Sequence, residues 1–248
     1  MSALWVEPDD LPRTETLHFC EPEGDGHMEF RLIYRGTLPA AGSGGARIKE
    51  KHTIRKHVHK QLRELWKQHP DLRELSKSKF VVYTTPYNLV SHPGPGVRQI
   101  VPADPASPTA KTWLQHIADD HQRCGGRWVP LVSKAGGFTC SLNILFLRRD
   151  NPGNLIASGG DIDNRIKVLF DGLKMPDTVS DLGGIPLGPD EDPFFCLLED
   201  DSLITSVSIT TDRLLIPQES DENVHDVCLI IHATVLNPSA LFTGNRLP

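Results

Sequence analysis

A chain of 248 residues, with 38% hydrophobic and 23% charged residues, has the composition of an ordinary globular protein that can bury a sizeable core. The formal net charge of −6 excludes a uniformly basic nucleic-acid binder, although basic residues gathered on one face would still bind nucleic acid. We expect neither a secretion signal nor a membrane span, and the five scattered cysteines favour reduced thiols and a cytoplasmic location.

The first predicted elements are a strand and a long helix. Residues 27–38 alternate apolar and polar side chains, which is typical of a strand. Residues 46–68 carry an apolar stripe at helical spacing, and His69-Pro70 ends that pattern. The stripe consists of Ile54, Val58, Leu62, Leu65 and Trp66.

The other faces of this helix are basic. Residues 47–79 hold eleven Lys or Arg against four Asp or Glu. Such a surface adds affinity for the DNA backbone without reading sequence, or it is a solvated face over a core stripe; both interpretations stay open. The candidate DNA-binding residues are Lys49, Lys51, Arg55, Lys56, Lys60 and Arg63.

Residues 80–135 give weaker signals. Residues 80–83 favour a short strand, and the five prolines between residues 91 and 110 favour a loop. Ser107 and Pro108 have the residue types of a helix start, so a helix is predicted from there to about residue 122.

The remaining chain predicts a strand over 138–147, a helix over 161–174, a Gly, Pro and Asp-rich loop over 177–193, and strands over 203–215 and 226–236. We expect the last two strands to form a hairpin through residues 217–223. The order strand, helix, strand, helix, strand, strand predicts an α+β fold with helices packed on a small mixed sheet.

The helix over 161–174 combines a core stripe with charges. Ile162, Ile166, Leu169 and Leu173 mark one face, while Asp163, Lys167 and Asp171 follow one another at intervals of four residues on another. Asp161 stands where an N-cap carboxylate is favoured. Most charges at this spacing are simply solvated, so the pattern alone does not define a site.

A second acidic cluster, Glu199-Asp200-Asp201, follows the apolar run 194–198. Three consecutive carboxylates repel one another unless something neutralises them, and Mg²⁺ is a cation that carboxylates hold. A shared metal site between this cluster and the 161–174 helix would polarise a phosphate and lower the pKa of a bound water.

The run Asp-Ile-Asp-Asn-x-x-Lys-x-x-x-Asp-x-Leu, followed by Glu-Asp-Asp-Ser-Leu-Ile, resembles the signature of the RusA family of Holliday-junction resolvases. The resemblance covers residues 136–236 and, more weakly, 28–69. It implies a single RusA-like β-α-β-α-β-β domain, with residues 80–135 and 177–193 as insertions. Gly160 departs from the family pattern, in which a basic residue often precedes the motif.

The resemblance also implies a function and a site. It implies a homodimeric endonuclease that hydrolyses phosphodiesters of branched DNA with Mg²⁺ or Mn²⁺. The implied catalytic residues are Asp161, Asp163, Lys167 and Asp201, and Asp200 joins the three aspartates as a metal ligand. The alternatives are a non-catalytic nucleic-acid or protein-interaction module on the same scaffold, and a metal-dependent nucleotide phosphohydrolase.

Overall fold

The computed structural model describes residues 27–38, 44–85, 97–102, 109–149, 161–215 and 226–236. Its main sheet contains β1 (His27–Thr37), β7 (Thr139–Arg148), β9 (Ile204–Arg213) and β10 (Asp226–Leu236). The strand order is β1-β10-β7-β9. β10 runs antiparallel to both of its neighbours, and β7 and β9 are parallel, so the sheet is mixed.

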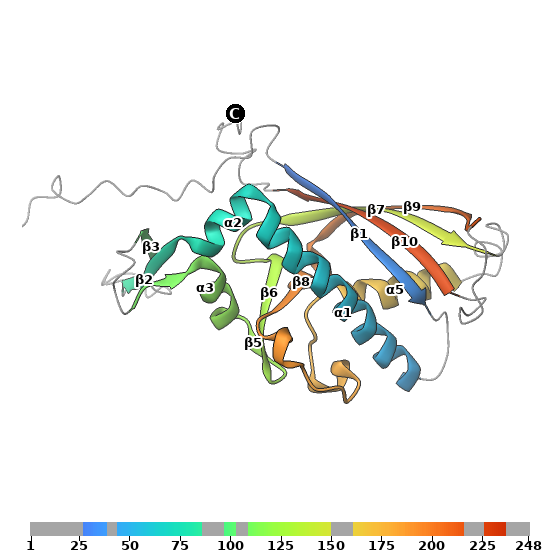
Figure 1. The fold of residues 1–248 in the computed structure, drawn as a ribbon, viewed down its shortest axis with the longest axis horizontal. Coiled ribbons are helices and arrows are strands. Elements are labelled where there is room, and N and C mark those ends of the chain that lie inside the picture. Colours follow the sequence, from blue (N-terminus) through green and yellow to red (C-terminus); the bar gives the residue numbers. More distant parts are fainter. Residues whose placement is uncertain are drawn as a thin grey trace, which may run out of the picture.

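Two helices, α1 (Gly44–Gln68) and α5 (Asp161–Leu173), lie against the same side of this sheet (Figure 1). Four apolar residues of α1 spaced by four, Ile54, Val58, Leu62 and Trp66, are buried there. The two helices touch at Gly172, where an added Cβ would lie 2.6 Å from Cγ2 of Ile54. A glycine is therefore required for this close approach.

A smaller sheet lies beside α1. It has the order β5-β6-β8, formed by β5 (Gln122–Arg123), β6 (Gly126–Val132) and β8 (Phe194–Leu198). β6 and β8 are parallel, and every residue of β8 is buried. The N–H of Met175 donates to the carbonyl of Leu198, so the chain leaving α5 is joined to the end of β8.

The remaining elements precede this sheet in the chain. They comprise α2 (Pro70–Lys77), β2 (Lys79–Thr85), β3 (Val97–Pro102), β4 (Lys111–Thr112) and α3 (Trp113–Asp120). Thr112 caps α3 by accepting a hydrogen bond from the N–H of Gln115, whose side chain accepts from the N–H of Thr112. The helix start predicted at Ser107 and Pro108 lies outside the described residues.

Short 3-10 turns complete the described chain: η2 (Val179–Leu182), η3 (Pro189–Glu191) and η4 (Asp201–Leu203). The four described cysteines are free, whereas Cys20 lies outside the described part. None of the described helices is long and apolar enough to cross a membrane.

The α+β class is confirmed, and six predicted elements coincide with β1, α1, β7, α5, β9 and β10. The predicted hairpin is wrong, because β9 and β10 are not neighbours: β7 lies between them. Burial accounts for the difference. β10 is rich in buried apolar residues and occupies a central position, whereas the Ser and Thr-rich β9 is largely exposed at the edge.

Candidate functional site

The helix α5 presents the acidic motif on the side opposite its core stripe. Ile166, Leu169 and Leu173 are buried, while Asp163 and Lys167 are exposed. Neither of these two charged side chains forms a hydrogen bond or ion pair with any residue that the structure describes. Asp161 is the first residue of the helix, but its side chain lies outside the described part.

The third acid of the helix has a structural partner. A carboxylate oxygen of Asp171 lies 2.6 Å from Nζ of Lys51 on α1, and both side chains are mostly buried. This ion pair joins α5 to α1. Asp171 is thereby committed to helix packing, which leaves Asp163 and Lys167 as the described charges of the motif that are available for chemistry.

The C-terminal end of α5 is capped by a buried arginine. Arg55 is 1% exposed and donates hydrogen bonds to the carbonyl oxygens of Asp171 at 2.7 Å, Lys174 at 3.0 Å and Asp181 at 3.3 Å. The last carbonyls of a helix have no partners within the helix, so a guanidinium beside them supplies the missing donors. Burial lowers the pKa of Arg55, which nearby acids partly restore.

The second acidic cluster is neutralised by groups of the protein itself. Asp200 accepts from the N–H of Ser202, and hydrogen bonds from Ser202 lower the pKa of Asp200. Glu199 accepts from the N–H of Lys134, and Asp201 lies 4.0 Å from Nζ of Lys174. The run of three carboxylates therefore needs no metal ion to exist in this fold.

Lys174 lies between two acids at this end of α5. Its ammonium is 2.8 Å from a carboxylate oxygen of Asp177 as well as 4.0 Å from Asp201. Burial lowers the pKa of Lys174, but the acids around it raise that pKa more, so the net shift is upward. Lys174 stays protonated in this setting and offsets the charge of Asp201.

Asp163 and Asp201 lie at opposite ends of the main sheet. Near its start, α5 is held by a hydrogen bond from Arg165 to the carbonyl of Leu38, at the end of the sheet where β7 stops. Asp201 directly precedes the start of β9, which is level with the start of β7. Lys174, next to Asp201, is about 16 Å further along the helix axis than Asp163, at about 1.5 Å per residue.

This arrangement does not let Asp201 share a metal ion with Asp163 within one chain. Oxygen ligands of Mg²⁺ lie about 2.1 Å from the ion, so two carboxylates on one ion must nearly touch. Among the described side chains, no three His, Cys, Asp or Glu residues are gathered closely enough to hold a metal. The single chain therefore does not bring Asp201 to Asp163.

The predicted basic surface of α1 is largely occupied by internal contacts. Lys56 pairs with Glu191 at 3.1 Å, and Arg63 donates to the carbonyl of Asp190 at 3.2 Å. Together with the pair between Lys51 and Asp171, these contacts attach the acidic 177–193 segment and α5 to α1. Sequence reasoning missed this, because the periodicity of a helix does not show which segment will cover its polar face.

Two corrections follow for the candidate DNA contacts. Arg55 was predicted as a phosphate contact, and that prediction is wrong because its guanidinium is buried against backbone carbonyls. Lys49 and Lys60 are the members of the predicted set that are exposed. A DNA surface along α1 would therefore have much less free charge than the sequence indicates.

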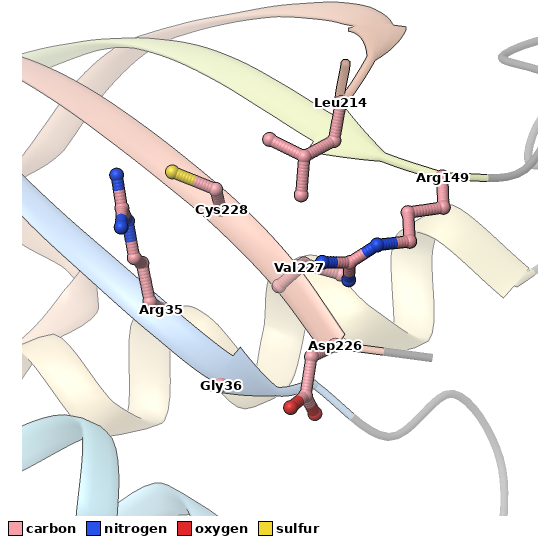
Figure 2. A pocket seen from close by; sticks show the side chains of 7 residues that line it. All are labelled: Arg35, Gly36, Arg149, Leu214, Asp226, Val227 and Cys228. Atoms are coloured by element: carbon pink, nitrogen blue, oxygen red, sulfur yellow. The ribbon is translucent and has the colours of Figure 1, made fainter. Parts of the chain in front are cut away.

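A small cavity of about 170 Å³ lies at the sheet end near the start of α5 (Figure 2). Arg35 of β1 and Arg149, which follows β7, line it together with Leu214, which follows β9, and the start of β10. The carboxylate of Asp226, at the same end, accepts a hydrogen bond from Thr37. Sequence reasoning did not single out either arginine, since they are 114 positions apart and only the sheet joins them.

The chain matches no family model, no curated protein and no solved structure.

Proposed function

We propose that this protein is a metal-dependent endonuclease that hydrolyses phosphodiester bonds of branched DNA, as the resemblance to the RusA family implies. The observation that carries the proposal is the contrast along α5. Asp171 is tied to Lys51, while Asp163 and Lys167, one turn apart, are exposed without a partner in the described chain.

The position of these side chains suits a phosphate substrate. The first turn of a helix leaves backbone N–H groups without partners, and its partial positive charge favours anions. Lys167 follows one turn later and would stabilise negative charge that develops on the phosphate. Asp161 and Asp163 would repel that phosphate on their own, so they require a divalent cation, Mg²⁺ or Mn²⁺, to act on it.

Other groups at the same end of the sheet support binding of a charged backbone. Arg35 and Arg149 bring two guanidinium groups to the cavity beyond the end of β7. Arginine matches phosphate geometry with paired donors, which lysine does not. In this proposal the DNA follows the end of the sheet near the start of α5, and not the covered basic face of α1.

A nuclease assay on four-way junction, flap and linear DNA with Mg²⁺ or Mn²⁺ tests the proposal. Asp163→Asn and Lys167→Met should each lower the cleavage rate at least ~100-fold, because each removes a charged group beside the reacting phosphate. Asp190→Asn is the matched control, since it makes the same change at an exposed acid in the 177–193 segment. Cleavage by Asp163→Asn at the wild-type rate would remove the basis of the proposal.

A non-catalytic role on the same scaffold is favoured by one observation: Asp201 lies at the far end of the sheet from Asp163 within one chain. A protein of that kind would bind junction DNA or a protein partner with or without the cation. Tight binding of four-way junction DNA, without cleavage in either Mg²⁺ or Mn²⁺, would support this second function.

A further inference from the structure

The main sheet has one face that none of the described helices or strands covers. The helices α1 and α5 lie against the other face (Figure 1), and Tyr34 of β1 points to that side, where its ring lies 5.5 Å from the ring of His57 on α1. Side chains alternate along a strand, so Arg31, Ile33 and Arg35 of β1 point away from the helices, and all three are exposed. We call this side of the four strands the outer face.

An apolar row crosses the outer face from one strand to the next. Ile33 is in register with Ile230 of β10, which is in register with Leu145 of β7. Ile33 is 50% exposed, and the other two side chains are only half-buried. A contiguous apolar surface that is rimmed by polar groups is typical of an interaction site.

The rim of this row on β1 is basic, since Arg31 and Arg35 flank it. Neither guanidinium forms a hydrogen bond or ion pair with any residue that the structure describes. The acid on this face of β1, Glu29, instead lies 3.3 Å from His27 and 3.2 Å from His232. A segment that covers this part of the outer face should therefore be apolar in its middle and acidic at its ends.

Residues 1–26, which precede β1 and lie outside the described part, contain a stretch of this kind. The segment holds one arginine and seven acids, at positions 7, 9, 10, 15, 21, 23 and 25. Glu15, Leu17, Phe19 and Glu21 occupy alternate positions, so in an extended chain they share one side. That side presents two apolar groups between two acids, and the outer face presents an apolar row between two arginines.

We propose that residues 15–21 lie extended along β1 on the outer face, antiparallel to it, with Leu17 and Phe19 on the apolar row. The two acids then each face one arginine. Because the segment is joined to β1 itself, its effective concentration at the face is on the order of millimolar, and a free acidic partner has to compete with it.

The length of the connection to β1 fits this placement. Glu21 comes to lie beside Arg31, which is about 13 Å from His27 along the strand, and a layer packed on a sheet lies about 10 Å above it. The direct path is therefore about 17 Å, while the six residue steps from Glu21 to His27 reach up to about 20 Å. Gly24 and Gly26 lie within this connection and permit the chain to reverse its direction.

The spacing of the charges fits as well. Glu15 and Glu21 are about 20 Å apart in an extended chain, whereas Arg31 and Arg35 are about 13 Å apart on β1. The long arginine side chains cover the difference by leaning away from each other along the sheet.

Charge distinguishes this segment from other occupants of the face. Residues 237–248 also begin at this end of the sheet, because Leu236 is in register with His27, but their one charged residue is Arg246. A second copy of the outer face would bring arginines to arginines. Residues 1–26 are both acidic and attached at the correct end.

The placement has a consequence for DNA, and this consequence alone rests on the proposed function. Arg35 lines the cavity to which a DNA phosphate is assigned above. In the proposed placement Glu15 lies beside the same guanidinium. Residues 15–21 and DNA therefore compete for Arg35.

Photo-crosslinking in the full chain tests the placement in the absence of DNA. Phe19 is replaced by benzoylphenylalanine, the protein is irradiated, and the linked peptides are identified by mass spectrometry. Links should form within one chain, at or beside Ile33, Ile230 and Leu145. Links to α1, to the 177–193 segment or to a second chain, or no links at all, would overturn the proposal.

Charge variants of the crosslinking protein test the ion pairs. Glu15→Gln with Glu21→Gln should lower the yield of these links about threefold to tenfold, because two exposed ion pairs are lost. Glu7→Gln with Glu23→Gln makes the same change outside residues 15–21 and should leave the yield as it is. Arg35→Glu should also lower the yield, and Glu15→Arg in the same chain should restore it. An equal loss in the control pair, or no recovery on exchange of the charges, would overturn the proposed pairing.

Binding of four-way junction DNA, measured by fluorescence anisotropy without divalent cations, tests the competition. The variant that lacks Glu15 and Glu21 should bind about threefold to tenfold more tightly than the control variant. Equal affinities, with the links intact, would overturn the competition and leave the placement standing. If neither variant binds DNA, the nuclease proposal fails, and the crosslinks still decide where residues 15–21 lie.

Discussion

Replacing Arg55 with Met removes three hydrogen bonds that hold the end of α5 and the η2 turn against α1. The guanidinium donates to the carbonyl oxygens of Asp171, Lys174 and Asp181, and its buried stem is similar in volume to Met. The change therefore isolates the loss of the donors from the loss of packing. The three carbonyl oxygens would then lose the hydrogen bonds that Arg55 donates to them.

The expected cost follows from the number and kind of bonds. A hydrogen bond from a charged donor contributes about 1.5–3 kcal/mol, so the three together contribute about 5–9 kcal/mol. Met does not have to be desolvated as a charge, and this offsets several kcal/mol. We expect Arg55→Met to lower the free energy of unfolding by about 3–5 kcal/mol, a large part of the ~5–15 kcal/mol typical of a folded domain.

Urea unfolding, followed by circular dichroism at neutral pH, measures this difference. Arg55→Lys should lose about 2 kcal/mol, because an ammonium keeps the charge but cannot reach three carbonyls with a planar fork. Lys60→Met, at an exposed position of the same helix, should stay within about 0.5 kcal/mol of wild type. A loss below about 1 kcal/mol for Arg55→Met would refute the reasoning.

Three further predictions concern the same helices. Gly172→Ala should cost about 1–3 kcal/mol, although Ala favours a helix by about 1 kcal/mol, because the added Cβ would lie 2.6 Å from Cγ2 and 2.7 Å from Cβ of Ile54; an Ile54→Ala background removes only the first of these contacts and should lower the cost without abolishing it, and an unchanged free energy of unfolding for Gly172→Ala in the wild-type background would contradict this. Asp171→Asn should cost about 1–2 kcal/mol, and unfolding in a Lys51→Gln background should show almost no further loss. Burial and the nearby Arg55 lower the pKa of His52 to about 4. The stability that neutral His52 provides is therefore fully present above about pH 6.5 and declines by up to about 3 kcal/mol toward pH 4. The free energy of unfolding of His52→Gln, measured with urea, should depend less on pH over this range than that of wild type, and an equal pH dependence would contradict this.

The elements of the core were predictable because their patterns are local. The four-residue spacing of Ile54, Val58 and Leu62 defines the buried face of α1, and the alternation over residues 27–38 defines β1. Exposure of Asp163 and Lys167 also follows from helical periodicity, since the opposite side of α5 holds the apolar stripe. Each of these properties depends only on residues that are close in the sequence.

The hairpin prediction failed for a non-local reason. Adjacent strands in a sequence usually pair, but β10 is apolar enough to be buried between β1 and β7, and β9 can tolerate an edge. That choice depends on the competition among all four strands for the centre of the sheet. A local stretch of the sequence therefore does not show which strand will occupy the centre of the sheet.

The sequence by itself determined which side chains α5 exposes and which it buries, because a helix fixes both through its period. Only the tertiary structure decided that Arg55 caps the end of α5, that the 177–193 segment covers the basic face of α1, and that Asp201 lies beside Lys174 at the far end of the sheet. These outcomes depend on pairing between residues far apart in the chain. The energy of such contacts is set by which partners meet in space, and spacing along the chain does not contain that information.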